Sequence, residues 1–210
     1  GSRDSGGRAA GVAYQAAAHM SVVRFNFTGT QIISRQVEEL RAVLREVCLR
    51  APGCRLFLLG RSLGGAASII TAAQTAGLAG LILWATPNDL RFTFHYVMGE
   101  ENYARLDAGE TLHFNDERGE CALTPDFLTE FDQYNLEDCL RRTRLPVLLL
   151  HCAGDEVVLV QQAKRNAEVL GERSELHIFA GGDHSFTEYS EQAGKIIAAW
   201  LCDKAAYPAD

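Results

Sequence analysis

Residues 54–65, CRLFLLGRSLGG, place a serine between an apolar run and a stretch of small residues. The run Cys54–Leu59 is typical of a buried strand, and Ala66–Ala76 is predicted to be a helix that packs closely on a sheet. Between them, Gly60 and Gly64 flank Ser62 in the pattern G-x-S-x-G. A nucleophilic serine projects from such a sharp strand-to-helix turn, and the glycines avoid side-chain collisions there. We therefore interpret Ser62 as a nucleophile, with an ordinary helix N-cap as the alternative.

Short apolar runs alternate with amphipathic segments on both sides of this stretch, which favours a mostly parallel sheet with helices on both faces. Further strands are predicted at Ser21–Phe27, Leu78–Ala85, Pro146–His151 and Ser174–Ala180. Helices are predicted around Arg8–His19, along Val37, Leu40, Leu44 and Val47 after a turn at Thr28-Gly29-Thr30, at Val160–Leu170, and from about Glu188 to Leu201. We expect one domain over residues 1–210.

A long polar and aromatic connection, Asn88–Arg144, interrupts this alternation. Connections of that length inside a compact domain are usually functional. We expect this 88–144 segment to be an inserted, partly helical cap over the site. The alternative is a surface excursion that only packs its own aromatic residues.

His184 is the histidine best placed to activate Ser62. A serine hydroxyl is a poor nucleophile at neutral pH and needs a base within hydrogen-bond reach. His184 follows the predicted strand Ser174–Ala180, so its loop lies at the carboxyl edge of a parallel sheet, where Ser62 also emerges.

Asp155 follows the predicted strand Pro146–His151 and reaches the same edge. An ionised carboxylate there fixes the tautomer of the imidazole and stabilises the imidazolium. Glu156 and Asp183 are the rival acids. The backbone N–H of Leu63, at the start of the following helix, is predicted to point toward a developing oxyanion.

Composition excludes several kinds of partner. The net charge is −7, from 20 Lys and Arg against 27 Asp and Glu, and no basic stripe suits a phosphate backbone. No apolar run approaches the ~20 residues that cross a bilayer. We therefore expect neither a nucleic-acid nor a membrane partner.

The six cysteines form no C-x-x-C or zinc-ribbon spacing. We expect free thiols in a reducing compartment, hence a cytoplasmic protein, with a disulfide as the alternative. His151, Cys152 and Asp155 resemble metal ligands in isolation, but no second ligand cluster accompanies them, so we expect no metal.

Together these residues resemble the α/β-hydrolase superfamily, most closely its serine aminopeptidase-type and cinnamoyl (feruloyl) esterase-like members. The resemblance extends from about Ser21 to the last helix and rests on VVRFNFTGT, GRSLGG, PVLLLHCAGDEVV and ELHIFAGGDHSF. It implies an α/β-hydrolase fold with an inserted cap, and Ser62, Asp155 and His184 as nucleophile, acid and base in that chain order. It further implies a serine hydrolase that cleaves a small carboxylic ester through an acyl-enzyme without a cofactor.

Two departures from the family concern the oxyanion hole. Family members carry a His-Gly turn after an earlier strand, and this turn supplies a second N–H to the oxyanion hole. The earlier strand lies between the SVVRFNF and CRLFLL strands in the family sheet. We expect this chain to begin past that turn, without the N-terminal strands of the family, and we expect upstream residues to precede Gly1. The family also has a polar, glycine-containing loop after the position of Thr28-Gly29-Thr30; here either this loop is short or residues of it are left out of the sequence. Loss of one oxyanion donor typically costs ~10²–10³ in rate.

Two other functions stay open. A serine aminopeptidase or amidase acting on small peptides would need carboxylates for a terminal amine, and the 88–144 segment contains Glu100, Glu101, Asp107, Glu110, Asp116 and Glu117. A solvated acidic face is the simpler interpretation of these residues. A non-catalytic α/β-hydrolase-fold binding protein is the third possibility.

Overall fold

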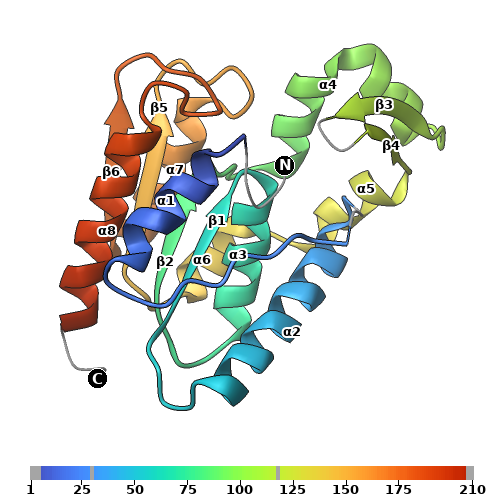
Figure 1. Cartoon of the computed structure of the whole chain (residues 1–210). Helices are drawn as coiled ribbons and strands as arrows, with labels where there is room; N and C mark the ends of the chain where they lie inside the picture. Colours follow the sequence, from blue (N-terminus) through green and yellow to red (C-terminus); the bar gives the residue numbers. More distant parts are fainter. Residues whose placement is uncertain (1–5, 29–30, 117–118, 207–210) are drawn as a thin grey trace.

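A four-stranded parallel sheet in the order β1-β2-β5-β6 forms the centre of the molecule (Figure 1). The computed structural model describes residues 6–28, 31–116 and 119–206. The strands are β1 (Leu56–Arg61), β2 (Leu78–Trp84), β5 (Val147–Cys152) and β6 (Ser174–Phe179). They match four of the five predicted strands within two residues at each end. Because every neighbouring pair is parallel, all four carboxyl ends lie at one edge.

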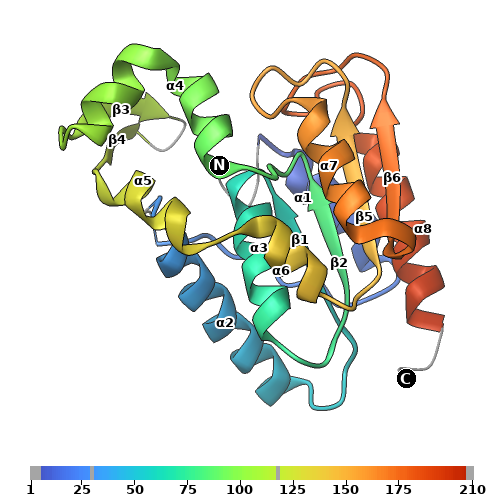
Figure 2. The same cartoon turned by 180° about the vertical axis from the view of Figure 1, so that it is seen from behind.

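Helices cover both faces of this sheet, as the sequence predicted (Figures 1 and 2). Along β2, Ile82 and Trp84 pack toward one face, and Leu81 and Leu83 toward the other, as the two-residue period of a strand requires. The first face is covered by α1 (Arg8–Ala17) and α8 (Ser190–Ala206). The second is covered by α2 (Ile33–Arg50), α3 (Leu63–Gln74), α6 (Leu136–Arg142) and α7 (Val160–Leu170).

The predicted strand Ser21–Phe27 is wrong: this segment is extended but lies outside the sheet. A strand needs a neighbouring ladder to satisfy its backbone groups, and within the described residues β1 pairs with β2 alone. The rings of Phe25 and Phe27 meet edge to face at 5.1 Å and pack on the core cluster that contains α2 and α3. The segment therefore partly buries its two phenylalanine rings while it crosses from α1 to α2 (Figure 1).

The predicted turn at Thr28-Gly29-Thr30 falls partly outside the described residues, which omit 29–30. Thr28 itself is held through its backbone N–H, which donates to Glu39 in α2 at 3.0 Å.

The 88–144 segment is partly helical, as predicted. It contains α4 (Leu90–Asp107), the antiparallel pair β3 (Leu112–Asp116) and β4 (Gly119–Leu123), α5 (Asp126–Thr129), the 3₁₀ turn η1 (Glu130–Gln133), and α6. Asp89 caps α4 by accepting from the Phe92 N–H at 2.9 Å. Phe94, Phe127 and Phe131 pack together, and α4 rises beyond the carboxyl edge of the sheet (Figure 1). Its role as a cap stays a prediction.

Candidate active site

Ser62 occupies a strained turn between β1 and α3. Its φ of 53° and ψ of −128° lie where a residue with a side chain is rarely found. A hydrogen bond from the Ser62 N–H to the Trp84 carbonyl, at 2.9 Å, continues the β1–β2 pairing. This bond holds the backbone of Ser62 in its strained conformation. The side chain makes no capping hydrogen bond to α3, so the alternative of an ordinary N-cap serine is wrong.

Close packing requires glycine at two positions around this turn. A Cβ on Gly60 would lie 2.5 Å from the Gly64 carbonyl oxygen, and one on Gly65 would lie 2.0 Å from Thr86 Oγ1. A Cβ on Gly64 would meet nothing nearer than Phe27 Cε2 at 3.8 Å, an ordinary contact. The expected collision at Gly64 is therefore wrong, and the position that sequence reasoning missed is Gly65.

The structure brings Ser62, His184 and Asp155 together from three loops at the carboxyl edge. His184 Nε2 lies 3.1 Å from Ser62 Oγ, and His184 Nδ1 lies 2.8 Å from Asp155 Oδ2. A carboxylate only accepts, so Nδ1 carries the hydrogen and Nε2 is left as the acceptor for the serine hydroxyl. This arrangement can pass a proton from Ser62 to an imidazole that Asp155 stabilises.

Asp155 is buried, yet both oxygens of its carboxylate accept hydrogen bonds. Burial alone raises the pKa of Asp155, but hydrogen bonds from His151, His184 and the Val158 N–H outweigh it and hold that pKa well below its usual range. Its Oδ1 accepts from the N–H groups of Val157 and Val158 at 2.9 and 2.8 Å. Asp155 therefore stays ionised beside His184.

Neither rival acid faces the imidazole. Asp183 is engaged by Thr187, which donates to it from its backbone N–H at 2.9 Å and from its hydroxyl at 2.7 Å. Glu156 is exposed. Among the three candidates from the sequence, only Asp155 contacts His184.

The acid and base loops are bound to each other where they leave β5 and β6. The Gly154 N–H donates to the Gly181 carbonyl at 2.9 Å. A Cβ on Gly154 would lie 2.6 Å from the Gly182 carbonyl oxygen, so the two backbones approach as closely as only glycine permits. This contact places the residue after Gly154, which is Asp155, next to the loop that carries His184.

Two residues that sequence reasoning missed hold the base loop on the sheet. Phe186 is fully buried, with its ring edge to face against Trp84 at 5.3 Å and Phe179 at 5.4 Å. Arg61, within the G-x-S-x-G turn, donates to the His184 carbonyl at 2.9 Å. The contacts of Phe186 with Trp84 and of Arg61 with His184 join residues far apart in the chain, so no local sequence pattern predicts them.

The metal-like group at the end of β5 is split between the two faces of the sheet. Cys152 belongs to the core cluster of α1 and α8, whereas His151, its neighbour on the strand, points to the opposite face. Burial raises the pKa of the Cys152 thiol to about 12, which disfavours the thiolate that a metal would bind.

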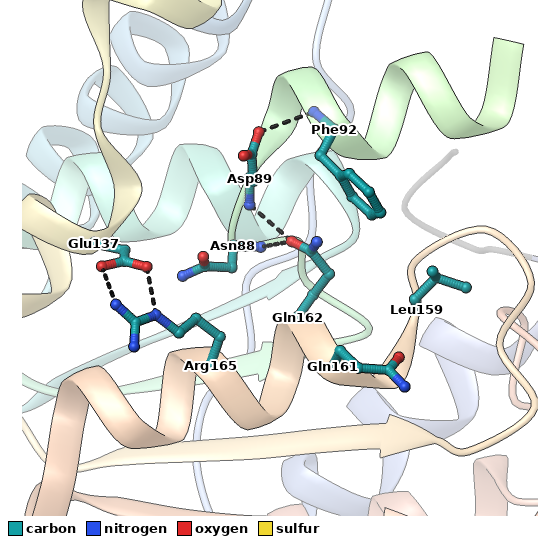
Figure 3. Close-up of a pocket in the computed structure, with 8 residues that line it drawn as sticks. All are labelled: Asn88, Asp89, Phe92, Glu137, Leu159, Gln161, Gln162 and Arg165. Atoms are coloured by element: carbon teal, nitrogen blue, oxygen red, sulfur yellow. Dashed lines mark hydrogen bonds and ion pairs between the residues drawn. The ribbon is translucent and has the colours of Figure 1, made fainter. Parts of the chain in front are cut away.

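A cavity of about 410 Å³ opens between the 88–144 segment and the chain that follows Asp155 (Figure 3). Phe92 of α4 and Leu159, just before α7, line it with apolar side chains. Glu137 and Arg165 form another wall, where Arg165 Nε donates to Glu137 Oε1 at 2.7 Å. Hydrogen bonds from Arg165 lower the pKa of Glu137. Asn88, Asp89, Gln161 and Gln162 complete the lining.

Solved structures with this fold are esterases and other serine hydrolases. The esterase domain of a Rhodothermus marinus protein matches with a TM-score of 0.72 and 22% identity over 92% of this chain and 79% of its own. Est1E from Butyrivibrio proteoclasticus matches with a TM-score of 0.79 and 14% identity over 95% of this chain and 82% of its own. Est1E has also been solved with ferulic acid bound. An esterase from Pyrococcus furiosus matches with a TM-score of 0.73 and 15% identity over 98% of this chain and 78% of its own.

No protein-family model and no curated protein matches the sequence. The similarity therefore lies in the three-dimensional structure, and the chain has the α/β-hydrolase fold that its motifs predicted.

Proposed function

We propose that this protein is a serine hydrolase that cleaves carboxylic esters through an acyl-enzyme. The observation that carries the proposal is the position of His184, whose two ring nitrogens lie 3.1 Å from Ser62 Oγ and 2.8 Å from Asp155 Oδ2. The strained φ of Ser62 at the start of α3 supports the same role.

In the proposed reaction, Ser62 Oγ attacks the ester carbonyl as its proton passes to His184 Nε2. The backbone N–H of Leu63, at the start of α3, is one donor to the oxyanion. His184 then gives its proton to the leaving alcohol as the C–O bond breaks, and Ser62 retains the acyl group. Water, activated by the same imidazole, releases the carboxylic acid. Asp155 keeps its negative charge throughout and stabilises the imidazolium.

The lining of the cavity in Figure 3 does not include Ser62 or His184, and we propose that this cavity accepts the far end of an apolar or aromatic acyl group. Phe92 is 48% exposed and stacks with Tyr96, so a ring placed beside it would bury apolar area that now faces water. The ferulic acid bound to Est1E is such an aromatic acid. Phe92→Ala is expected to lower kcat/KM for methyl ferulate about tenfold, as burial of a few methylene equivalents would, and to leave kcat/KM for p-nitrophenyl acetate unchanged.

Hydrolysis of p-nitrophenyl acyl esters tests the reaction, with Ser62→Ala as the inactive variant. We expect turnover by the wild type and a loss of about 10⁴-fold or more in Ser62→Ala, since the serine and its base act as one unit. Comparable turnover by the variant would refute Ser62 as the nucleophile.

Aminoacyl-p-nitroanilides, measured in parallel, distinguish an aminopeptidase. An amine-binding role would need free carboxylates, and two of the six candidates are engaged: His95 lies 2.8 Å from Glu100, and Arg105 donates to Glu110 at 2.8 Å. Glu101 and Asp107 are exposed, and Glu117 lies outside the described residues. We therefore expect kcat/KM to be higher for the esters than for the anilides. Absence of turnover on both substrate classes by the folded protein would favour a binding protein.

We also propose that the protein acts in the cytoplasm on a small-molecule substrate, without nucleic-acid or membrane partners. All six cysteines are free, which supports a reducing compartment. Within the described ranges, no helix has both the length and the apolarity to span a bilayer.

A further inference from the structure

His151 is a buried imidazole behind the acid of the candidate site. It stands in β5, where the residues before it are Val147, Leu148, Leu149 and Leu150, and its side chain is fully enclosed. A polar side chain at such a position costs free energy unless it is hydrogen-bonded. The question is therefore what its two ring nitrogens contact.

The Nε2 atom of His151 faces two oxygens of the acid loop. It lies 2.7 Å from the Val158 carbonyl oxygen and 3.3 Å from Asp155 Oδ2. Both oxygens are acceptors, so Nε2 must carry a hydrogen. Nδ1 is buried and has no hydrogen-bond partner among the described residues. A hydrogen there would be unsatisfied, so the contacts favour the neutral Nε2–H tautomer.

Asp155 is consequently held from both sides. Its Oδ1 accepts two backbone N–H groups, whereas its Oδ2 lies between the imidazole of His184 at 2.8 Å and that of His151 at 3.3 Å. His151 also joins the end of β5 to Val158, at the far end of the loop that carries Asp155. The carboxylate plane thus has little freedom to turn Oδ2 away from His184.

We propose that His151 is a positioning residue: as a neutral Nε2–H imidazole, it fixes the acid loop and directs Asp155 Oδ2 at His184. Its neutrality matters because a cation at this place would compensate the charge of Asp155, which the His184 imidazolium needs. The inference rests on the proposed function, in which Asp155 orients the base.

Two variants of nearly equal length and shape separate the donor from the packing. His151→Gln keeps an N–H donor that reaches the position of Nε2, and His151→Met fills the same space without one. We expect kcat of the Met variant on a p-nitrophenyl ester to fall about 10- to 100-fold, as loss of a hydrogen bond to a charged group does. KM should stay within about threefold, and the Gln variant should recover most of kcat. A folded Met variant with wild-type kcat, or equal losses in both variants, would overturn the proposal.

Nitrogen-15 NMR of histidine-labelled wild-type protein gives a readout that needs neither catalysis nor a folded variant. The ring shifts of His151 should show a hydrogen on Nε2 and none on Nδ1 at neutral pH. A hydrogen on Nδ1, alone or in an imidazolium, would contradict the inference even if the Met variant does not fold. If the wild type cleaves no ester, the proposed function fails, whereas these shifts still decide how His151 meets Asp155.

Discussion

The guanidinium of Arg61 donates to the backbone carbonyl of His184 at 2.9 Å, so the residue before the candidate nucleophile holds the loop of the candidate base. The same guanidinium lies 5.7 Å from the centre of the Trp84 ring, a cation–π contact that fixes its direction. One side chain of the strand-to-helix turn therefore links β1, β2 and the base loop.

Replacing Arg61 should loosen the base loop without unfolding the protein. We expect Arg61→Gln to lower kcat about three- to tenfold, because one charge-assisted hydrogen bond is lost while the buried ring of Phe186 still anchors the loop. Arg55 is the matched control, since it also donates to a backbone carbonyl, that of Ala205 at 3.1 Å, away from the site. An equal kcat loss in Arg55→Gln would contradict the role of Arg61.

Neutralising the acid should weaken catalysis far more. Asp155→Asn leaves the base without a charge partner and permits the wrong imidazole tautomer, so we expect kcat to fall about 10³- to 10⁴-fold. Glu156→Gln, a change at the exposed neighbour, should keep kcat within twofold. Steady-state kinetics on one ester compares all three proteins, and similar losses in both variants would refute the assignment of Asp155.

The ionised Asp155 should also make stability depend on pH. Because its pKa in the folded protein lies below the ordinary value of about 3.9, its contribution is fully present above that pH and is lost as the pH falls toward the folded value. The difference in unfolding free energy between wild type and Asp155→Asn should therefore shrink on acidification. Urea unfolding at about pH 6 and pH 3 measures it, and a difference that grows in acid would contradict the cited pKa shift.

Replacement by alanine should destabilise the protein at one of two adjacent glycines of α3 and not at the other. Gly65→Ala would force a Cβ to within 2.0 Å of Thr86 Oγ1, a buried side chain, so we expect a loss of about 1–3 kcal/mol or more in unfolding free energy. Gly64→Ala meets only an ordinary contact and should lose nothing, because alanine is the better helix former. Denaturant unfolding of the two variants tests this packing. Equal losses of unfolding free energy in both would contradict it.

The cysteines should divide by exposure. Cys48, Cys54 and Cys202 are exposed and should react quickly with Ellman's reagent, whereas Cys139 and Cys152 are buried and should react only on unfolding. Burial raises the pKa of both buried thiols, which further slows the reaction. Reduction with dithiothreitol should leave the melting temperature unchanged. Fast reaction of all six thiols in the folded protein would contradict this.

Much of the site could be predicted because its parts are local. The pattern around Ser62 combines a strand, a turn and a helix within neighbouring residues, and Asp155 and His184 each follow an apolar run that became a strand. Since parallel strands share one carboxyl edge, the sequence alone predicted that the three residues would meet there.

The rest depends on partners that local patterns do not specify. Ser21–Phe27 alternates like a strand, but a strand forms only beside another strand. Here Phe25 and Phe27 pack against each other and against the hydrophobic core instead. The contacts of Arg61 with His184 and of Gly65 with Thr86 likewise join separate segments in space. Their residue types are unremarkable in the sequence.

Labelling with a fluorophosphonate tests the central claim most directly, because the reagent is attacked by an activated serine and loses fluoride as the adduct forms. If Ser62 is activated by His184, mass spectrometry should find one phosphonyl adduct on the peptide that contains Ser62, and none in Ser62→Ala. A folded wild-type protein that takes up no label, or takes it up at another residue, would contradict the account.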